Sequence, residues 1–237
     1  MKKWFACGRK RGTRMREVAG MITDNIRITR VSNVLSLVHI CTYLHPSPPM
    51  TIVQFIQTQL HADIRTNADL PFTITEQIFP PGKIITAYGQ QETNAYFLKS
   101  GLVQISMMYN GDEKILDFVF ENNFFGGYTS LLTSRPSDTQ LTTLAETEVE
   151  IIAYSDLLNA YAGSLLANQL GRHVTERLFV NYTIRQKDLL TKTAEQRYRD
   201  LLEKRPDIIA LIPVNKIAKY LGIHPESLSR IRKAIIS

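Results

Sequence analysis

The sequence is poor in cysteine and has no clustered metal ligands. Only two of its 237 residues are cysteines, Cys7 and Cys41, and both lie within the first 49 positions. A disulfide framework and a cysteine-ligated iron–sulfur cluster are therefore excluded from the rest of the chain. The five histidines are scattered, without the short spacing of a metal site. We therefore expect no metal ion and no other cofactor.

Catalytic signatures and long apolar runs are also missing. The sequence contains no P-loop, no Rossmann glycine fingerprint and no spacing typical of a Ser-His-Asp triad. A β-barrel enzyme of the cupin type would need a cluster of histidine and carboxylate ligands, which the sequence lacks. No apolar stretch is long enough to span a bilayer. We therefore expect no catalytic residues, no enzyme activity, no membrane partner and a cytoplasmic protein.

The charge is distributed unevenly along the chain, although the formal total is only +6. Residues 1–49 carry 9 basic and 2 acidic side chains, residues 50–190 carry 9 and 15, and residues 191–237 carry 10 and 5. A basic terminal module is the charge distribution expected of a nucleic-acid-binding domain. A merely solvated basic tail is the alternative.

The first 49 residues differ in composition from the rest. A run of lysines and arginines up to Arg16 precedes a mildly apolar stretch from Val31 to Leu44. This order superficially resembles a secretory signal, but the basic part is too long and no small-residue cleavage site follows. We interpret residues 1–49 as a basic extension that is disordered or not part of the core.

The next segment predicts a short helical region followed by many strands. Residues 51–69 carry apolar side chains at three- and four-residue spacing, which predicts a helix. The period then shortens, and Asn110-Gly111 supplies the positive-φ residues of a tight hairpin. The predicted strands are Lys83–Tyr88, Ala95–Lys99, Leu102–Tyr109, Lys114–Phe120, Leu141–Leu144 and Val149–Ile152. Short, regularly spaced strands predict a small all-β sandwich or barrel.

After Tyr154 the helical pattern returns and continues for dozens of residues. It contains an apolar stripe that includes Leu166, Leu170, Val174 and Leu178. One small β domain cannot cover such a long helix, so we expect these four residues to form the seam of a homodimer. The alternative is that the stripe packs entirely onto the β domain.

The last 25 residues hold the most specific pattern. A short helix from Val214 ends at Gly222, which can adopt the left-handed conformation of a tight turn. Ala218 is small where a second helix would cross closely, and Pro225 suits the first turn of that second helix. This spacing predicts a helix-turn-helix, with an ordinary helical hairpin as the alternative.

The outward face of the second predicted helix is polar and basic. Arg230 can make a bidentate contact to guanine, and Glu226 can accept a hydrogen bond from cytosine. A surface ion pair between these two residues is the other interpretation. We expect further contacts, mainly to phosphates, from Ser227, Ser229, Lys233, Lys216 and Lys192. Arg197, Arg199, Arg232 and Lys219 are additional candidates.

The order helix, β-roll, long helix and helix-turn-helix resembles the Crp/Fnr family of bacterial regulators. The residues that carry the resemblance are Pro80, Gly82, Ser100-Gly101, Asn110-Gly111, Phe124-Phe125-Gly126 and the run from Leu221 to Arg232. The resemblance covers residues 50–237, and its end motif is similar to that of Bacteroidetes-type members. It implies an α+β fold with a double-stranded β-helix at residues 50–160, a dimerisation helix at 161–190 and a helix-turn-helix domain at 191–237.

The resemblance also implies a function and partners. Members of the family are homodimeric transcription regulators that bind inverted-repeat operators in double-stranded DNA and act on RNA polymerase. A small-molecule effector is a further possible partner, and the resemblance places its pocket in the β-roll. The pocket candidates are Phe125, Gly126, Gly127, Tyr128, Thr139 and Gln140.

The β-roll departs from the family's cyclic-nucleotide site. Members that bind cyclic nucleotides carry a Gly-Glu pair and, about a dozen residues later, Arg-Ser or Arg-Thr. Here these positions are Gly126-Gly127 and Thr139-Gln140, and Arg135 lies a few residues too early. A phosphate without a charge-assisted partner would bind poorly, so we expect no tight binding of cyclic AMP.

Two further departures concern the C-terminal region. Family members often have an arginine where Pro225 stands, and they usually carry a β-wing beyond the second helix, whereas the sequence ends at Ser237. The alternative function is a cyclic-nucleotide-binding-like sensor that acts through a protein partner without binding DNA.

Overall fold

The structure, a computed structural model, describes residues 48–236. The expectations for the basic extension therefore lie outside the described residues, except at Pro48 and Pro49. The described helices are α1 (Ile52–Leu60), η2 (Asn67–Asp69, a 3-10 turn), α2 (Tyr128–Thr133), α3 (Tyr154–Gly163), α4 (Leu165–Thr191), α5 (Ala194–Lys204), α6 (Ile208–Leu211), α7 (Val214–Leu221) and α8 (Pro225–Ile236). The described strands are β1 (Thr75–Phe79), β2 (Ile84–Thr86), β3 (Asn94–Ser100), β4 (Val103–Tyr109), β5 (Asp112–Val119), β6 (Asn123–Phe125), β7 (Thr139–Thr143) and β8 (Thr147–Ala153).

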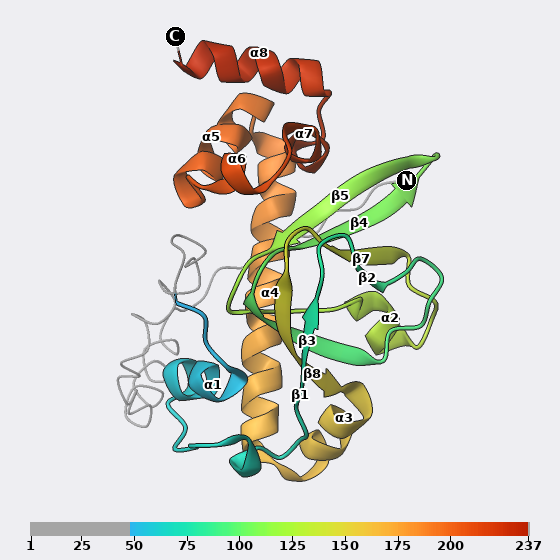
Figure 1. Cartoon of the computed structure of the whole chain (residues 1–237), viewed down its shortest axis with the longest axis vertical. Coiled ribbons are helices and arrows are strands. Elements are labelled where there is room, and N and C mark those ends of the chain that lie inside the picture. The colour runs from blue at the N-terminus through green and yellow to red at the C-terminus, as the bar shows by residue number, and fades with distance from the viewer. Residues whose placement is uncertain (1–47, 237) are drawn as a thin grey trace, which may run out of the picture. The chain divides into compact units, whose positions relative to one another are not determined.

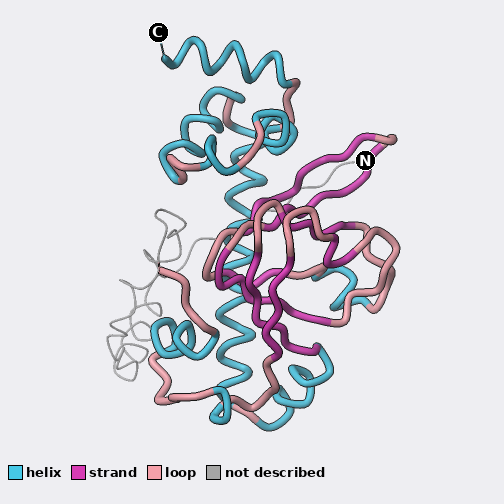
Figure 2. The backbone as a smooth tube through the Cα atoms, viewed as in Figure 1, coloured by secondary structure: helices cyan, strands magenta, loops and turns pink. Residues whose placement is uncertain are grey.

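The strands form a β-roll of two four-stranded sheets. The strand orders are β1-β8-β3-β6 and β2-β7-β4-β5, and the pairs are antiparallel. Figure 2 shows the strands gathered in one region, with helices on either side of it. Apolar side chains between the sheets, including Leu98, Val103 and Leu141, form its core. The α+β fold with a double-stranded β-helix, a long helix and C-terminal helices is therefore as the sequence predicts.

The predicted strands are all present, with shifted ends, but some elements differ from expectation. The sequence analysis missed β1, β6 and α2, because β1 is mostly exposed and the other two are short. The predicted helix over residues 51–69 is too long. The observed helix α1 begins after a capping box at Thr51. It ends at Leu60, because His61 adopts a left-handed conformation with φ 54°.

The long helical region is divided into two helices. Ser164 is extended, and its side chain accepts a hydrogen bond from the Ala167 backbone, so that α3 ends and α4 begins there. Helix α4 then runs for 27 residues along the β-roll to the C-terminal helices (Figure 1). Its first half packs on α1 and the β-roll in a shared apolar core.

One residue of the expected dimer seam, Leu170, is buried within the chain. Leu170 is 3% exposed within the chain's own core, and Leu166 and Val174 pack against the same cluster. Leu170 is therefore covered by the chain's own core, whereas Leu166, Val174 and Leu178 are only partly buried, and their part in a dimer seam stays a prediction. The apolar side chains that α4 leaves exposed lie on another face, at Leu165, Phe179, Tyr182, Leu189 and Leu190.

The turn at Gly101 allows a strong test of this fold. Gly101 has a φ of 103°, and a Cβ there would lie 2.7 Å from the Thr147 Cα atom. Gly111 also has a positive φ, of 81°, but a Cβ there would meet nothing within 4 Å. We predict that Gly101→Ala lowers the free energy of unfolding by about 2–5 kcal/mol, because strain and overpacking add. Gly111→Ala should lower it by only about 1–2 kcal/mol.

Urea unfolding of the two variants, followed by circular dichroism, measures this difference. Equal losses for Gly101→Ala and Gly111→Ala would contradict the close approach of the Gly101 turn to β8.

Candidate nucleic-acid interface

Helices α7 and α8 form the predicted helix-turn-helix. Helix α7 ends at Leu221, and Gly222 is left-handed with φ 71° and ψ 32°. The Gly222 N–H donates to the Lys219 carbonyl, and the Ile223 N–H donates to the Ala218 carbonyl at 3.0 Å. These bonds close the helix end and redirect the chain, so that α8 begins at Pro225 as a separate helix.

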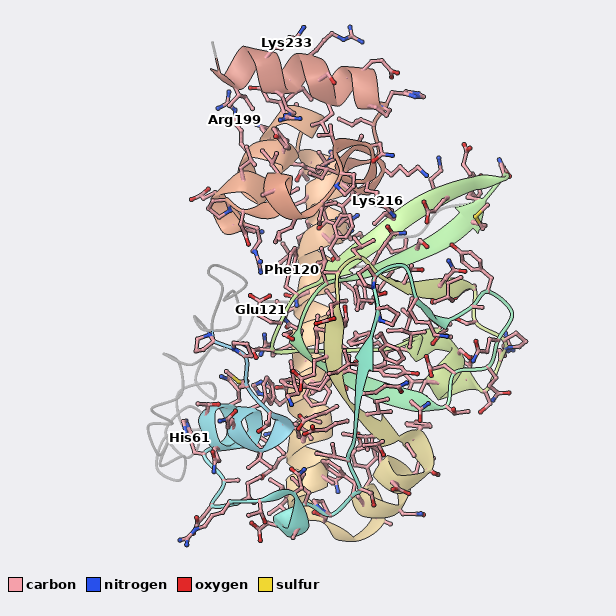
Figure 3. The ribbon with its side chains drawn as sticks, in the orientation of Figure 1. His61, Phe120, Glu121, Arg199, Lys216 and Lys233 are labelled. Carbon is pink, nitrogen blue, oxygen red and sulfur yellow. The ribbon has the colours of Figure 1, made fainter. Side chains whose placement is uncertain are left out.

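The inward and outward faces of α8 are as the spacing predicts. Leu228 is fully buried against Ile217 and Leu221 of α7, in a cluster that also includes Tyr198 of α5. Glu226, Ser229, Arg230 and Lys233 are exposed, and Ser227 is partly buried. Figure 3 shows Lys233 on the outer side of α8, away from α5 and α7. Among the described residues, no ion pair joins Glu226 to Arg230.

Several basic residues that were expected to contact phosphates instead bind partners within the chain. Lys192 forms ion pairs with Asp188 at 2.9 Å and Asp200 at 2.6 Å. Arg197 donates to the backbone carbonyls of Lys192 and Leu221, and Arg199 pairs with Glu195. Lys192 therefore connects α4 with α5 in this structure, and its expected contact with a phosphate stays a prediction.

Lys216 and Lys219 of α7 contact the β4–β5 hairpin. The Lys219 ammonium donates to Glu113 at 3.0 Å, and the Lys216 ammonium donates to the Gln104 side-chain oxygen. Gln104 in turn donates to Glu113 at 2.8 Å, so the four residues form one network. Burial would raise the pKa of the Glu113 carboxyl, but the two lysines and Gln104 hold that pKa below its usual value. Figure 3 shows Lys216 beside the hairpin.

A second connection between the C-terminal helices and the β-roll centres on Arg205. This side chain pairs with Asp207 at 2.8 Å and with Glu121 at 3.4 Å. Its guanidinium also lies 3.8 Å from the centre of the Phe120 ring. Phe120 and Glu121 follow β5, as labelled in Figure 3. The sequence analysis singled out none of these residues, because nothing local marks a pair separated by more than 80 positions.

The pocket candidates of the β-roll are only partly brought together. Gly126 and Gly127 lead into α2, and a Cβ on Gly127 would lie 3.2 Å from the Ser137 hydroxyl. Ser137 in turn donates to the Thr139 carbonyl, so Gly127 and Thr139 share this neighbour. Phe125 is fully buried and stacks on Tyr96 in the core, which corrects its expected place in the pocket. Gln140 donates to Thr142, and Tyr128 is the first residue of α2.

A buried carboxylate lies beside the glycine pair. Glu92 is 4% exposed, and a Cβ on Gly127 would lie 3.6 Å from its carboxylate. The carboxylate accepts hydrogen bonds from the Thr86 hydroxyl and from the backbone N–H groups of Thr93 and Asn94. Burial, together with the charge of Glu92, raises the pKa of the neighbouring Tyr96 to about 12. The sequence analysis did not identify Glu92.

Comparisons with known proteins agree with this geometry. Residues 76–164 match the family model of the cyclic nucleotide-binding domain. The fold is similar to the c-di-GMP-responsive global regulator CLP of Xanthomonas campestris, at 21% identity and a TM-score of 0.55 over 68% of this chain and 86% of that chain. It is also similar to FixK2 of Bradyrhizobium japonicum, at 19% identity and a TM-score of 0.57 over 69% and 84% of the two chains.

A third similar structure comes from Eubacterium rectale and is assigned to the Crp/Fnr family of transcriptional regulators. It is 18% identical, with a TM-score of 0.58 over 68% of this chain and 78% of that chain. No curated protein sequence matches the chain significantly. At these identities the likeness shows the fold, which is that of structures in the Crp/Fnr group. None of the described helices is both long enough and apolar enough to cross a bilayer.

Proposed function

We propose that this chain is a homodimeric transcription regulator of the Crp/Fnr type that inserts α8 into the major groove of an inverted-repeat operator. The observation that carries the proposal is the exposed polar face of α8, which Leu228 anchors from behind and the left-handed Gly222 separates from α7. An α-helix fits the major groove of B-DNA, where each base pair presents a distinct pattern of donors and acceptors. The likeness in fold and the basic C-terminal region support the same function.

Within this proposal, Arg230 and Glu226 contact base edges, and Ser227, Ser229 and Lys233 set the register on phosphates. All five belong to α8, and four of them are exposed. The carboxylate of Glu226 is one turn from Arg230, so it can orient the guanidinium toward guanine. A contact with RNA polymerase and a small-molecule effector remain parts of the proposal that only the family resemblance supports.

The exposed apolar face of α4 supports a homodimer. Phe179 is 71% exposed and Leu190 is 79% exposed, and Tyr182 lies between them on the same helix. Pairing of this face with a second copy would remove these side chains from water. Such a dimer would present two α8 helices to half-sites one helical turn apart, about 34 Å along the duplex.

Substitution of Arg230 tests the proposed base contact. We predict that Arg230→Ala weakens binding at the cognate guanine position by about 1–3 kcal/mol and relaxes discrimination there, because the bidentate contact is lost. Arg65→Ala is the matched control, since Arg65 is an exposed arginine on the loop after α1 that pairs with Asp63, outside the C-terminal helices. A genomic footprint defines the operator, and fluorescence anisotropy with single-base operator variants measures affinity and discrimination.

An Arg230→Ala protein that discriminates among operator variants as the parent does would refute the base contact. The alternative function, a sensor that acts through a protein partner, predicts no operator and no salt-dependent DNA affinity at all. Phosphate contacts make DNA affinity fall steeply with salt, so a titration at several salt concentrations separates the two functions.

The contacts of Lys216 and Lys219 with the hairpin make a second prediction about DNA binding. If these lysines serve phosphates in the complex, Glu113 competes with DNA for Lys219. The ion pair is partly exposed, and such pairs contribute only about 0.2–1 kcal/mol. We therefore predict that Glu113→Gln tightens DNA binding by about 1.4- to fivefold.

Glu76→Gln is the control for this substitution, because Glu76 pairs with Lys99 on the β-roll instead of with α7. Anisotropy at fixed salt compares the two variants with the parent. An unchanged or weaker affinity of Glu113→Gln would show that the hairpin does not compete for these lysines.

We further propose that the β-roll does not bind cyclic AMP. Gly127 lies beside the buried carboxylate of Glu92, so a phosphate next to Gly127 would meet a negative charge. The family's phosphate-binding arginine would stand at the position of Thr139-Gln140, where neither side chain carries a positive charge. We predict that isothermal titration of cyclic AMP into the protein gives no micromolar binding, and a clear micromolar isotherm would overturn this reading of the pocket.

A further inference from the structure

A cavity of about 190 Å³ lies where α4, β5, α5 and α7 meet. It belongs neither to the polar face of α8 nor to the glycine pair of the β-roll, although Tyr182 and Leu189 of its wall also belong to the exposed apolar face of α4. An apolar cavity of about 150 Å³ is large enough to hold benzene. This cavity therefore has room for one ring with a small substituent.

Aromatic side chains form much of the cavity wall. Phe118 of β5 and Tyr220 of α7 line it, with ring centres 5.2 Å apart, and Tyr182 lines it from α4. The Arg185 guanidinium lies 3.8 Å from the centre of the Tyr220 ring and donates to the Tyr220 carbonyl at 2.9 Å. Arg185 covers one face of the Tyr220 ring, and the remaining aromatic surface forms an apolar wall against which a ring can pack.

Asp117 of β5 and Arg185 of α4 both line this cavity and carry opposite charges, but among residues 48–236 they do not form an ion pair with each other. Burial raises the pKa of the Asp117 carboxyl to about 6, although the charge of Arg185 and the Phe118 N–H act in the opposite direction. The hydrogen bond that Asp117 accepts comes from the adjacent Phe118 N–H, so the carboxylate can accept more.

The other charged groups around the cavity have partners or face solvent. Asp188 and Asp200 pair with Lys192. Arg205 pairs with Asp207 and Glu121, and Arg197 donates to two backbone carbonyls through its terminal nitrogens, while its buried Nε atom has no hydrogen-bond partner in the part of the chain that the structure describes. Lys204 is exposed. Asp117 keeps acceptor capacity, and Arg185 uses one of its five N–H donors on the Tyr220 carbonyl, so both can bind a ligand in this cavity.

We propose that this cavity is a binding site for a small, uncharged, planar carboxamide or lactam held between Asp117 and Arg185. The edge of such a group presents an N–H donor beside a carbonyl acceptor. The donor matches the carboxylate, the acceptor matches the guanidinium, and the ring lies against Phe118 and Tyr220. A ligand carboxylate would be repelled by Asp117, and a ligand amine would be repelled by Arg185.

The walls of the site come from the β-roll, from α4 and from the C-terminal helices. A ligand can therefore bind only while these elements keep the arrangement described here, and binding favours that arrangement in return. This inference does not depend on DNA binding, and its test uses no DNA.

Benzamide is the probe that tests the site. The full chain, labelled with ¹⁵N, is titrated with benzamide while the side-chain Nε–H signal of Arg185 is followed by NMR. We expect a saturable shift of that signal with a Kd on the order of 1 mM, the affinity expected of so small a ligand. Asp117→Asn should weaken binding by about tenfold, because the charge-assisted bond is lost. Asp63→Asn is the control, since Asp63 is exposed on a distant loop.

Benzoate and benzylamine, titrated into the unaltered protein, test the ligand class without any substitution. Benzamide should bind more tightly than either. An Arg185 signal that benzamide leaves unmoved, equal affinity in Asp117→Asn and the parent, or tighter binding of benzoate or benzylamine would each overturn the proposal.

Discussion

The structure depends on one apolar cluster that the β-roll and the C-terminal helices share. The β-roll contributes Leu102, Ile115, Phe118 and Phe120, and the C-terminal helices contribute Tyr198, Ile208, Ile217, Leu221 and Leu228. Apolar burial is strong but non-directional, so it holds the two parts together without fixing their angle. Polar pairs at the edge of the cluster, such as Lys219 with Glu113 and Arg205 with Glu121, supply the direction. The position of α8 is therefore set by contacts with β5 and the loop after it.

The sequence predicted what local chemistry determines. Gly222, Ala218 and Leu228 lie within a dozen positions of one another, and each is required by the turn or by the close crossing of two helices. Their spacing therefore predicted α7, the turn and the buried face of α8 correctly. The hairpin between β4 and β5 follows in the same way from Asn110-Gly111, where both residues have positive φ.

Contacts between distant segments were not predictable in this way. Lys216 and Gln104 are 112 positions apart, and no periodicity connects them. The apolar stripe on α4 was assigned to a dimer seam. The sequence pattern of such a stripe is the same whether the β-roll of the same chain or a second copy of the chain covers it. Glu92 was missed for a related reason. Its sequence context gives no sign that Thr86, Thr93 and Asn94 surround its carboxylate and make burial of the charge tolerable.

The net positive charge of the C-terminal region overstates how many of its basic side chains are available to bind DNA. Lys192, Lys219 and Arg205 contribute to the net charge of +5 that pointed to DNA, yet each is paired with a carboxylate. A phosphate backbone would have to compete for the lysines. The pair of Lys219 and Glu113 is partly exposed and contributes little, so this competition is mild. The shared apolar cluster is the larger obstacle to movement of α8. An effector that repositions α8 must therefore act on the packing around Phe118 and Phe120 rather than on the surface ion pairs.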